Sequence, residues 1–155
     1  MYINIHTHLD KVADNVLTVK NIFPGRLKEE LPSDCFISVG LHPWYINSRN
    51  PESGLSVIAE YASHPEVIAI GETGLDKFRG PSPEIQEEVF LHHHDISQSV
   101  RKPLIIHCVR SYTDIIALRK KLKPSVPWII HGFNSSLQTA MQLIRNDCLL
   151  SFGPA

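Results

Sequence analysis

The sequence predicts an α/β protein in which parallel strands form one sheet covered by helices. Short apolar runs alternate along the chain with longer amphipathic stretches, the pattern of successive strand and helix units. The 155 residues, 43% hydrophobic and 20% charged, suffice for one domain with its own core. No low-complexity stretch or linker divides them. We therefore expect a single domain over residues 1–155.

Six apolar runs are predicted to be the strands of this sheet. Each is bounded by glycine, proline or polar residues, which interrupt regular structure. The runs are Tyr2–Ile5, Cys35–Val39, Val67–Ile70, Leu104–Ile106, Trp128–Ile130 and Cys148–Phe152. The segment Asp10–Phe23 shows no clear period, and we expect it to be loose and partly helical.

Four segments carry the pattern of helices, namely Pro51–Ala62, Pro81–Val100, Tyr112–Leu122 and Leu137–Ile144. In the longest, apolar residues recur at helical spacing and form part of one stripe. The same segment contains the run His92–His94. Consecutive helical residues point about 100° apart, so these three cannot share one face. We interpret them mainly as partly exposed helix positions.

Polar side chains of similar chemistry stand at the ends of the predicted strands. His6 and His8 end the first strand, where residues two apart point to the same side. Later strands end in Glu72, His107 and His131. The carboxyl ends of parallel strands meet at one face of the sheet, so we expect these five residues to converge.

Imidazole and carboxylate groups together form the donor set of a divalent metal ion such as Zn, Mg or Mn, and no thiolate is present to select a softer metal. Five such ligands exceed the needs of one tetrahedral ion. They suffice for two divalent metal ions that share Glu72 as a bridge. A pair of ions ~3.5–4 Å apart can hydrolyse esters or amides with water as the nucleophile.

Several residues near these strand ends have more than one interpretation. Arg79 and Arg110 follow Glu72 and His107, and they either bind a substrate phosphate or are solvated surface charges. His42 follows the second strand and either contacts substrate or shapes a turn. Cys108 is interpreted as a small buried side chain, because no spacing supports a cysteine–histidine hydrolase.

Six short motifs surround the predicted ligands. They are Ile5–Asp10, Gly40–Pro43, Ile70–Asp76, Gln86–Phe90, Lys102–Cys108 and His131–Phe133. As a set and in this order, they resemble the TatD-type metal-dependent deoxyribonucleases of the amidohydrolase-like barrel superfamily. The resemblance covers the chain from end to end.

The resemblance implies a TIM-type (β/α) barrel with about six of eight βα units present. It implies that His6 and His8 hold one ion, that Glu72 bridges two, and that His107 and His131 hold the second. It further implies that metal-activated water hydrolyses phosphodiesters of DNA, as a 3′-exonuclease acting on single strands. A phosphomonoesterase, amidase or lactonase would use the same ligands.

One part of the family pattern has no match in this chain. Relatives carry a Gly-x-Glu-Thr-Asp-like motif whose aspartate is expected to position or deprotonate the attacking water. Asp10, Asp76 and Asp147 lie in other elements and are poor substitutes. We interpret the chain as a fragment of a full barrel, a protein completed by another chain, or an open sheet with a weakened site. Unpaired sheet edges favour self-association.

Composition limits the remaining alternatives. The formal net charge of −1 gives no basic surplus that would indicate nucleic-acid binding, although DNA or a small phosphoester remains compatible as substrate. Three cysteines without a CxxC motif favour a reducing compartment, and we expect a cytoplasmic protein. No secretory signal is expected at the N-terminus. No apolar run approaches the ~20 residues that span a membrane.

Two functions therefore remain open. The first is a dinuclear metal-dependent hydrolase of the TatD type, with Glu72 as its catalytic bridging residue. The second is a metal-binding, catalytically impaired partial barrel that acts as an interaction module.

Overall fold

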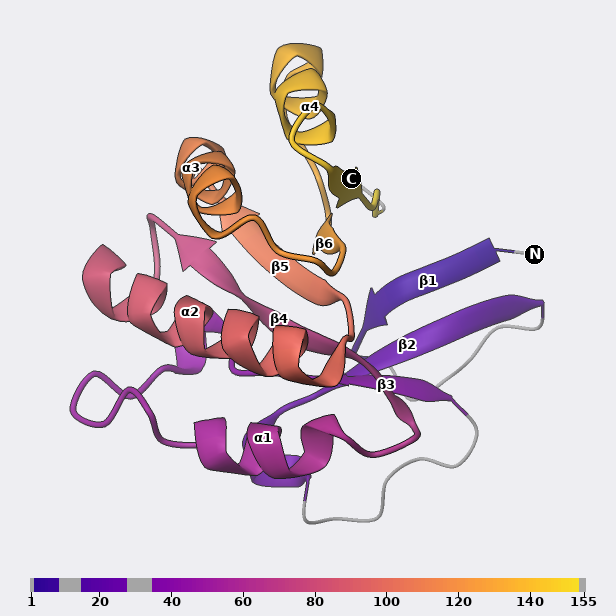
Figure 1. Ribbon diagram of the computed structural model, residues 1–155, viewed down its shortest axis with the longest axis vertical. Helices are drawn as coiled ribbons and strands as arrows, with labels where there is room; N and C mark the ends of the chain where they lie inside the picture. Colours follow the sequence, from indigo (N-terminus) through magenta and orange to yellow (C-terminus); the bar gives the residue numbers. More distant parts are fainter. Residues whose placement is uncertain (1, 9–14, 28–34, 154–155) are drawn as a thin grey trace.

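The computed structural model describes residues 2–8, 15–27 and 35–153, which form one curled parallel sheet (Figure 1). Its seven strands follow the order of the chain, and every neighbouring pair is parallel. They are β1 (Tyr2–Thr7), β2 (Val16–Ile22), β3 (Phe36–Val39), β4 (Val67–Asp76), β5 (Leu104–Val109), β6 (Trp128–Ile130) and β7 (Cys148–Leu150). The carboxyl ends of all seven strands consequently point to one rim.

The helices pack along one side of the sheet (Figure 1). They are α1 (Leu55–Ala62), α2 (Pro83–Val100), α3 (Tyr112–Leu122) and α4 (Leu137–Ile144), which follow β3, β4, β5 and β6 in turn. Two short 3-10 helices, η1 (Pro24–Arg26) and η2 (Pro43–Tyr45), follow β2 and β3. No α-helix in residues 2–8, 15–27 and 35–153 is both long and apolar enough to cross a lipid bilayer.

Strand alternation produces two apolar layers. Side chains such as Ile70, Ile106 and Trp128 point toward the helices and are fully buried. Val19 and Ile105 belong to a smaller cluster separate from this helix-covered core. Each fully buried aliphatic or aromatic side chain contributes about 1.5–3 kcal/mol to folding. The apolar layers thus hold the strands in place and leave the polar residues at the rim.

The predicted parallel α/β arrangement is confirmed, but one strand was missed. The prediction that Asp10–Phe23 is loose and partly helical is wrong for β2, while residues 10–14 lie outside the described residues. The signal in β2 is the alternation of Leu17 and Val19 with Thr18 and Lys20. Asn21 obscures it, and the strand accommodates Asn21 because its Nδ2 donates to Ser38 Oγ at 3.1 Å and to the carbonyl oxygen of Gly71.

The histidine run in α2 does not share one face, but it is more buried than predicted. His92 is exposed and lies 3.8 Å from Glu52, whereas His93 and His94 are buried. The interpretation as partly exposed positions is therefore wrong for these two residues. The reason is that α2 packs against both β4 and α1, so that more than one of its faces is covered.

Candidate metal centre

Strand β4 carries the acidic residue at the middle of the rim. It continues past the predicted end at Ile70, so Glu72 lies inside the strand and is only 3% exposed. Gly71 precedes it with a left-handed φ of +117°, and a Cβ there would collide with the carbonyl oxygen of Ile105. Only glycine lets β4 approach β5 this closely at the position before Glu72.

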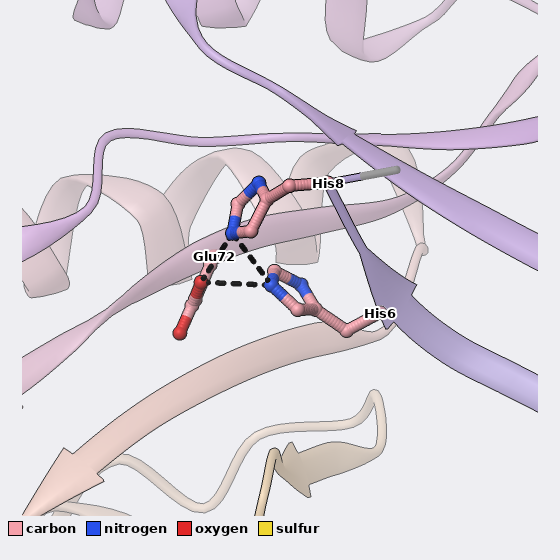
Figure 2. Close-up of side chains that lie close together, drawn as sticks. All are labelled: His6, His8 and Glu72. Carbon is pink, nitrogen blue, oxygen red and sulfur yellow. Dashed lines mark hydrogen bonds and ion pairs between the residues drawn. The ribbon is translucent and has the colours of Figure 1, made fainter. Parts of the chain in front are cut away.

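The first histidine pair faces one carboxylate oxygen of Glu72 (Figure 2). The Nε2 atom of His6 lies 3.0 Å from Glu72 Oε2, and that of His8 lies 3.9 Å from the same atom. The two Nε2 atoms are 3.1 Å apart. His6 is buried, whereas 51% of the His8 side chain is exposed. All three candidate ligand atoms lie within 4.8 Å of one another.

A second histidine pair faces the other oxygen of the same carboxylate. His107 Nδ1 lies 3.1 Å from Glu72 Oε1, and His42 Nε2 lies 3.6 Å from it. These two nitrogens are 3.2 Å apart. Together with Glu72 they form a second group whose ligand atoms all lie within 4.8 Å of one another. Glu72 is therefore placed between two pairs of imidazoles.

His131 lies beside this cluster rather than in the second group. It follows the end of β6, and its ring centroid is 4.0 Å from that of His6. Among the described residues, the position next to His107 is taken by His42, which sequence reasoning considered only as a substrate contact or a turn residue. The available signal was its place just beyond the end of β3, the same signal that identified His107.

Asp76 contacts His107 of the second group at Nε2, the ring nitrogen that does not face Glu72. Its Oδ2 lies 3.0 Å from His107 Nε2 and accepts a hydrogen bond from Trp44 Nε1 at 2.7 Å. Its Oδ1 accepts from the backbone N–H groups of Phe78 and Arg79 at 2.8 and 3.1 Å. Each ring nitrogen of His107 thus faces a carboxylate, Nδ1 facing Glu72 and Nε2 facing Asp76, and a proton held on Nε2 would leave the Nδ1 lone pair available to a metal ion.

This arrangement is the carboxylate–histidine support common to metal-binding imidazoles, and sequence reasoning missed it. Asp76 stands four residues after Glu72 in one strand, so both side chains belong to the same face. That spacing was the signal that could have found it.

The charges of the cluster match a cation site. Burial lowers the pKa of His42 and of His131 to about 4, so both imidazoles are neutral. Burial also raises the pKa of Glu72, but hydrogen bonds from His107 and His6 outweigh this effect and keep the carboxyl ionised. For His107, burial lowers the pKa while Glu72 and Asp76 raise it, and the carboxylates prevail.

The residues present fit a divalent ion. The Nε2 atoms of His6 and His8 meet at 3.1 Å, where facing lone pairs repel unless a proton or cation lies between them. The buried Nδ1 of His6 also has no hydrogen-bond partner among the described residues. Nitrogen and carboxylate donors without sulfur suit Zn, Mg or Mn.

The two predicted phosphate-binding arginines lie in different surroundings. The guanidinium of Arg79 lies 3.8 Å above the ring of Trp44, whose indole N–H holds Asp76. Arg110 lines a separate polar pocket of about 540 Å³ formed after β5 and β6, together with residues such as Thr113 and Asn134. The structure therefore does not bring the two cations together.

Fold and donor set define a class of protein, a TIM-type arrangement with a candidate metal centre at the carboxyl ends of its strands. A family profile described as TatD related DNase matches residues 5–155, and the chain belongs to this family.

Two relatives illustrate the match. The chain is 33% identical over 120 residues to an uncharacterized metal-dependent hydrolase, YabD, of Bacillus subtilis, covering 76% of this chain and 47% of that protein. It is 30% identical over 136 residues to the 3′-5′ ssDNA/RNA exonuclease TatD of Citrobacter rodentium, covering 84% and 51%. The chain thus spans about half the length of the curated relatives it matches.

Solved structures agree on the fold. The TatD homologue YjjV of Escherichia coli superimposes with a TM-score of 0.68 at 21% identity, covering 86% of this chain and 54% of that chain. A TatD family hydrolase of Entamoeba histolytica gives a TM-score of 0.69 at 20% identity, covering 86% and 51%. These similarities confirm the predicted TIM-type fold.

Proposed function

We propose that the chain forms the metal-binding part of a divalent-metal-dependent hydrolase that acts on phosphodiesters of DNA. The observation that carries the proposal is the position of Glu72, whose two carboxylate oxygens each face a separate pair of imidazoles. The relative from Citrobacter rodentium, named an exonuclease of single-stranded DNA and RNA, supports the choice of substrate class.

Each residue of the cluster would have a separate task in metal binding. His6, His8 and Glu72 would hold one ion, and His107 and Glu72 would hold a second, with His42 beside them as a hydrogen-bond donor. His131, next to His6, supplies a further nitrogen ligand. Divalent ions bound here would activate water and stabilise negative charge on phosphate oxygens.

The residues around the ligands orient the cluster and its substrate. With an ion bound, Asp76 would accept the Nε2 proton of His107 and leave its Nδ1 lone pair directed toward the cluster. His42 Nδ1 accepts the backbone N–H of Trp44 at 3.1 Å, so neutral His42 carries its proton on Nε2 and directs it toward His107 Nδ1 and Glu72 Oε1. Arg79 and Arg110 provide positive charge for the substrate backbone on either side of the cluster.

One observation favours the second function, a metal-binding module without turnover. Both oxygens of Asp76 are already engaged, by His107 and Trp44 on one side and by two backbone N–H groups on the other. Asp76 is therefore not free to accept a proton from an attacking water. The alternative requires that metal binding persist while hydrolysis is absent.

Metal analysis combined with hydrolysis assays separates the two functions. Bound metal is measured by mass spectrometry, and hydrolysis is measured on a labelled single-stranded oligonucleotide and on bis(p-nitrophenyl) phosphate. Metal-dependent cleavage that is lost in Glu72→Gln supports the hydrolase. Stoichiometric metal without cleavage supports the module, and absence of metal binding contradicts both. Glu60→Gln, an exposed carboxylate of α1 outside the candidate metal groups of the described residues, is the matched control.

Two further expectations belong to this proposal. Cys108 and Cys148 are buried free thiols, which supports a cytoplasmic location. Ile3 on β1 and Leu149 on β7 are 62% and 55% exposed at the two edges of the sheet, which supports self-association. Light scattering at increasing protein concentration tests the latter, and a strictly monomeric chain contradicts it.

A further inference from the structure

A largely apolar pocket of about 640 Å³ lies beside the metal centre. It is formed by the segments that follow β2 and β3, at the same rim as Glu72, and by the start of α1. Its lining includes Phe23, Pro24, Gly25, Leu41, Tyr45 and Val57. None of these residues belongs to the metal cluster. The volume lies within the range of pockets that bind small organic molecules.

The aromatic wall of this pocket contacts both histidine pairs. The ring of Phe23 stacks on that of His8, with centroids 5.5 Å apart and planes at 14°. Tyr45 meets Phe23 edge-on at 5.1 Å and lies 5.8 Å from the ring of His42. A ligand that occupies the pocket therefore lies directly next to any group held by the metal centre.

The pocket walls are held in position by the surrounding structure. The backbone N–H of Leu41 donates to Nε2 of the fully buried His93 at 3.0 Å. Gly54 at the start of α1 is so close to η1 that a Cβ there would lie 3.0 Å from Pro24. Tyr45, by contrast, is 61% exposed, so its ring presents a free face.

We propose that this pocket binds the nucleobase of the nucleotide whose phosphate lies at the metal centre. This inference rests on the proposed function and names the part of the substrate that the apolar side of the site recognises. A nucleobase is planar and aromatic, and stacking on protein aromatic rings is a sequence-tolerant way to hold it. The lining offers few polar groups. The pocket therefore binds a ligand that carries a nucleobase more tightly than one that lacks it, but it does not distinguish the four bases.

Gly25 offers a way to fill the pocket. A Cβ added at Gly25 has no atom within 4 Å, and its backbone is not in the left-handed region. Gly25→Leu can therefore place a side chain in the pocket without disturbing the core. Gly153 has equally open surroundings and does not line the pocket, so Gly153→Leu is the matched control.

The test measures equilibrium binding by ligand-observed NMR, with and without a divalent ion. One ligand pair is thymidine 5′-monophosphate and 2-deoxyribose 5-phosphate, and the other is thymidine and 2-deoxyribose. We expect the ligand with the base to bind at least about tenfold more tightly than its partner. The preference disappears in Gly25→Leu and in Tyr45→Ala, and it persists in Tyr45→Phe and in Gly153→Leu.

Equal affinity within both pairs overturns the pocket assignment, and so does a preference that survives in Gly25→Leu. Failure of the proposed function gives a different result. In that case the divalent ion does not increase the affinity of either phosphate, while the comparison of thymidine with 2-deoxyribose still decides whether the pocket binds a base.

Discussion

The loops after β2 and β3 border the metal centre with aromatic rings, whereas the loops after β5 and β6 border it with polar groups. We call residues 23–25 and 41–45 the aromatic flank and residues 108–113 and 132–135 the polar flank. Phe23 and Tyr45 contact histidines from the first, while Arg110 and Asn134 line the pocket of the second. Both flanks stand at the same rim of one sheet, so only their side chains distinguish them.

Under the proposed function, the two flanks would contact different parts of the substrate. Stacking surfaces suit the bases of a single strand, and positive charge with hydroxyl and amide groups suits its phosphates and sugars. Helices α3 and α4 also begin at the polar flank, with Thr113 and Thr139 lining its pocket. The partial positive charge of helix N-termini favours anions there. Glu72 lies between the flanks, which makes it the residue whose loss affects both.

The largest effect is expected from Glu72→Gln. The amide keeps the shape but removes the negative charge that both imidazole pairs share, so metal affinity falls by about 100-fold or more and hydrolysis is lost. Calorimetric titration with the metal measures this change. Retention of two tightly bound ions would show that Glu72 is not the shared ligand.

The next largest effect is expected in the pH dependence of folding stability, and it arises from His93, which supports the aromatic flank. Burial lowers the pKa of His93 from 6.5 to about 4, and its Nε2 accepts the N–H of Leu41. Between these pH values the unfolded chain binds a proton that the folded chain does not. Stability is therefore full above about pH 6.5 and falls as the pH decreases toward 4, by about 3 kcal/mol from this residue.

Urea unfolding across this pH range measures the loss. Other buried histidines add to it in the native chain, so the comparison with His93→Gln isolates the part due to His93. We expect the variant to be less stable at neutral pH and to lose less stability in acid. Parallel pH profiles of the two proteins would refute the assignment.

A smaller effect is expected from Asp76→Asn, the strand β4 residue that contacts His107. An amide at this position can no longer act as the anionic acceptor for His107 Nε2–H, so metal affinity falls by about 10- to 100-fold while the fold persists. The nitrogen chemical shifts of His107 should also lose the pure Nε2–H pattern. Asp114→Asn, whose exposed carboxylate pairs with Lys77 at 2.6 Å, serves as the control. Unchanged shifts would limit Asp76 to a structural role.

The smallest effect is expected from Arg110→Gln. An exposed cation that contacts a phosphate contributes a few-fold to the affinity for an oligonucleotide, and its removal lowers the slope of log affinity against log salt by about 1. Fluorescence anisotropy at several salt concentrations measures both quantities. Arg101→Gln, at the end of α2, is the control. If both variants behave alike, Arg110 does not distinguish the polar flank.

The sequence predicted the residues at the rim better than the strand β2 and the burial of the helix α2. His6, His8, Glu72 and His107 were identified because strands are short-range patterns and parallel strands end at one face. The strand β2 escaped because Lys20 and Asn21 interrupt its apolar run, and Asn21 is tolerated only through partners on β3 and β4. The burial of His93 was missed because it depends on what packs around α2 and not on α2 alone.

By itself, the sequence determined that His6, His8, Glu72, His107 and His131 lie at one rim of the sheet, because strand period and strand order are local properties. Only the tertiary structure decided their pairing. The curl of the sheet and the paths of the loops set His42 beside His107 and His131 beside His6, and they turned Asp76 toward the far nitrogen of His107. These contacts join residues up to 125 positions apart, counted from His6 to His131. Side-chain directions at that separation follow from packing, which no local pattern encodes.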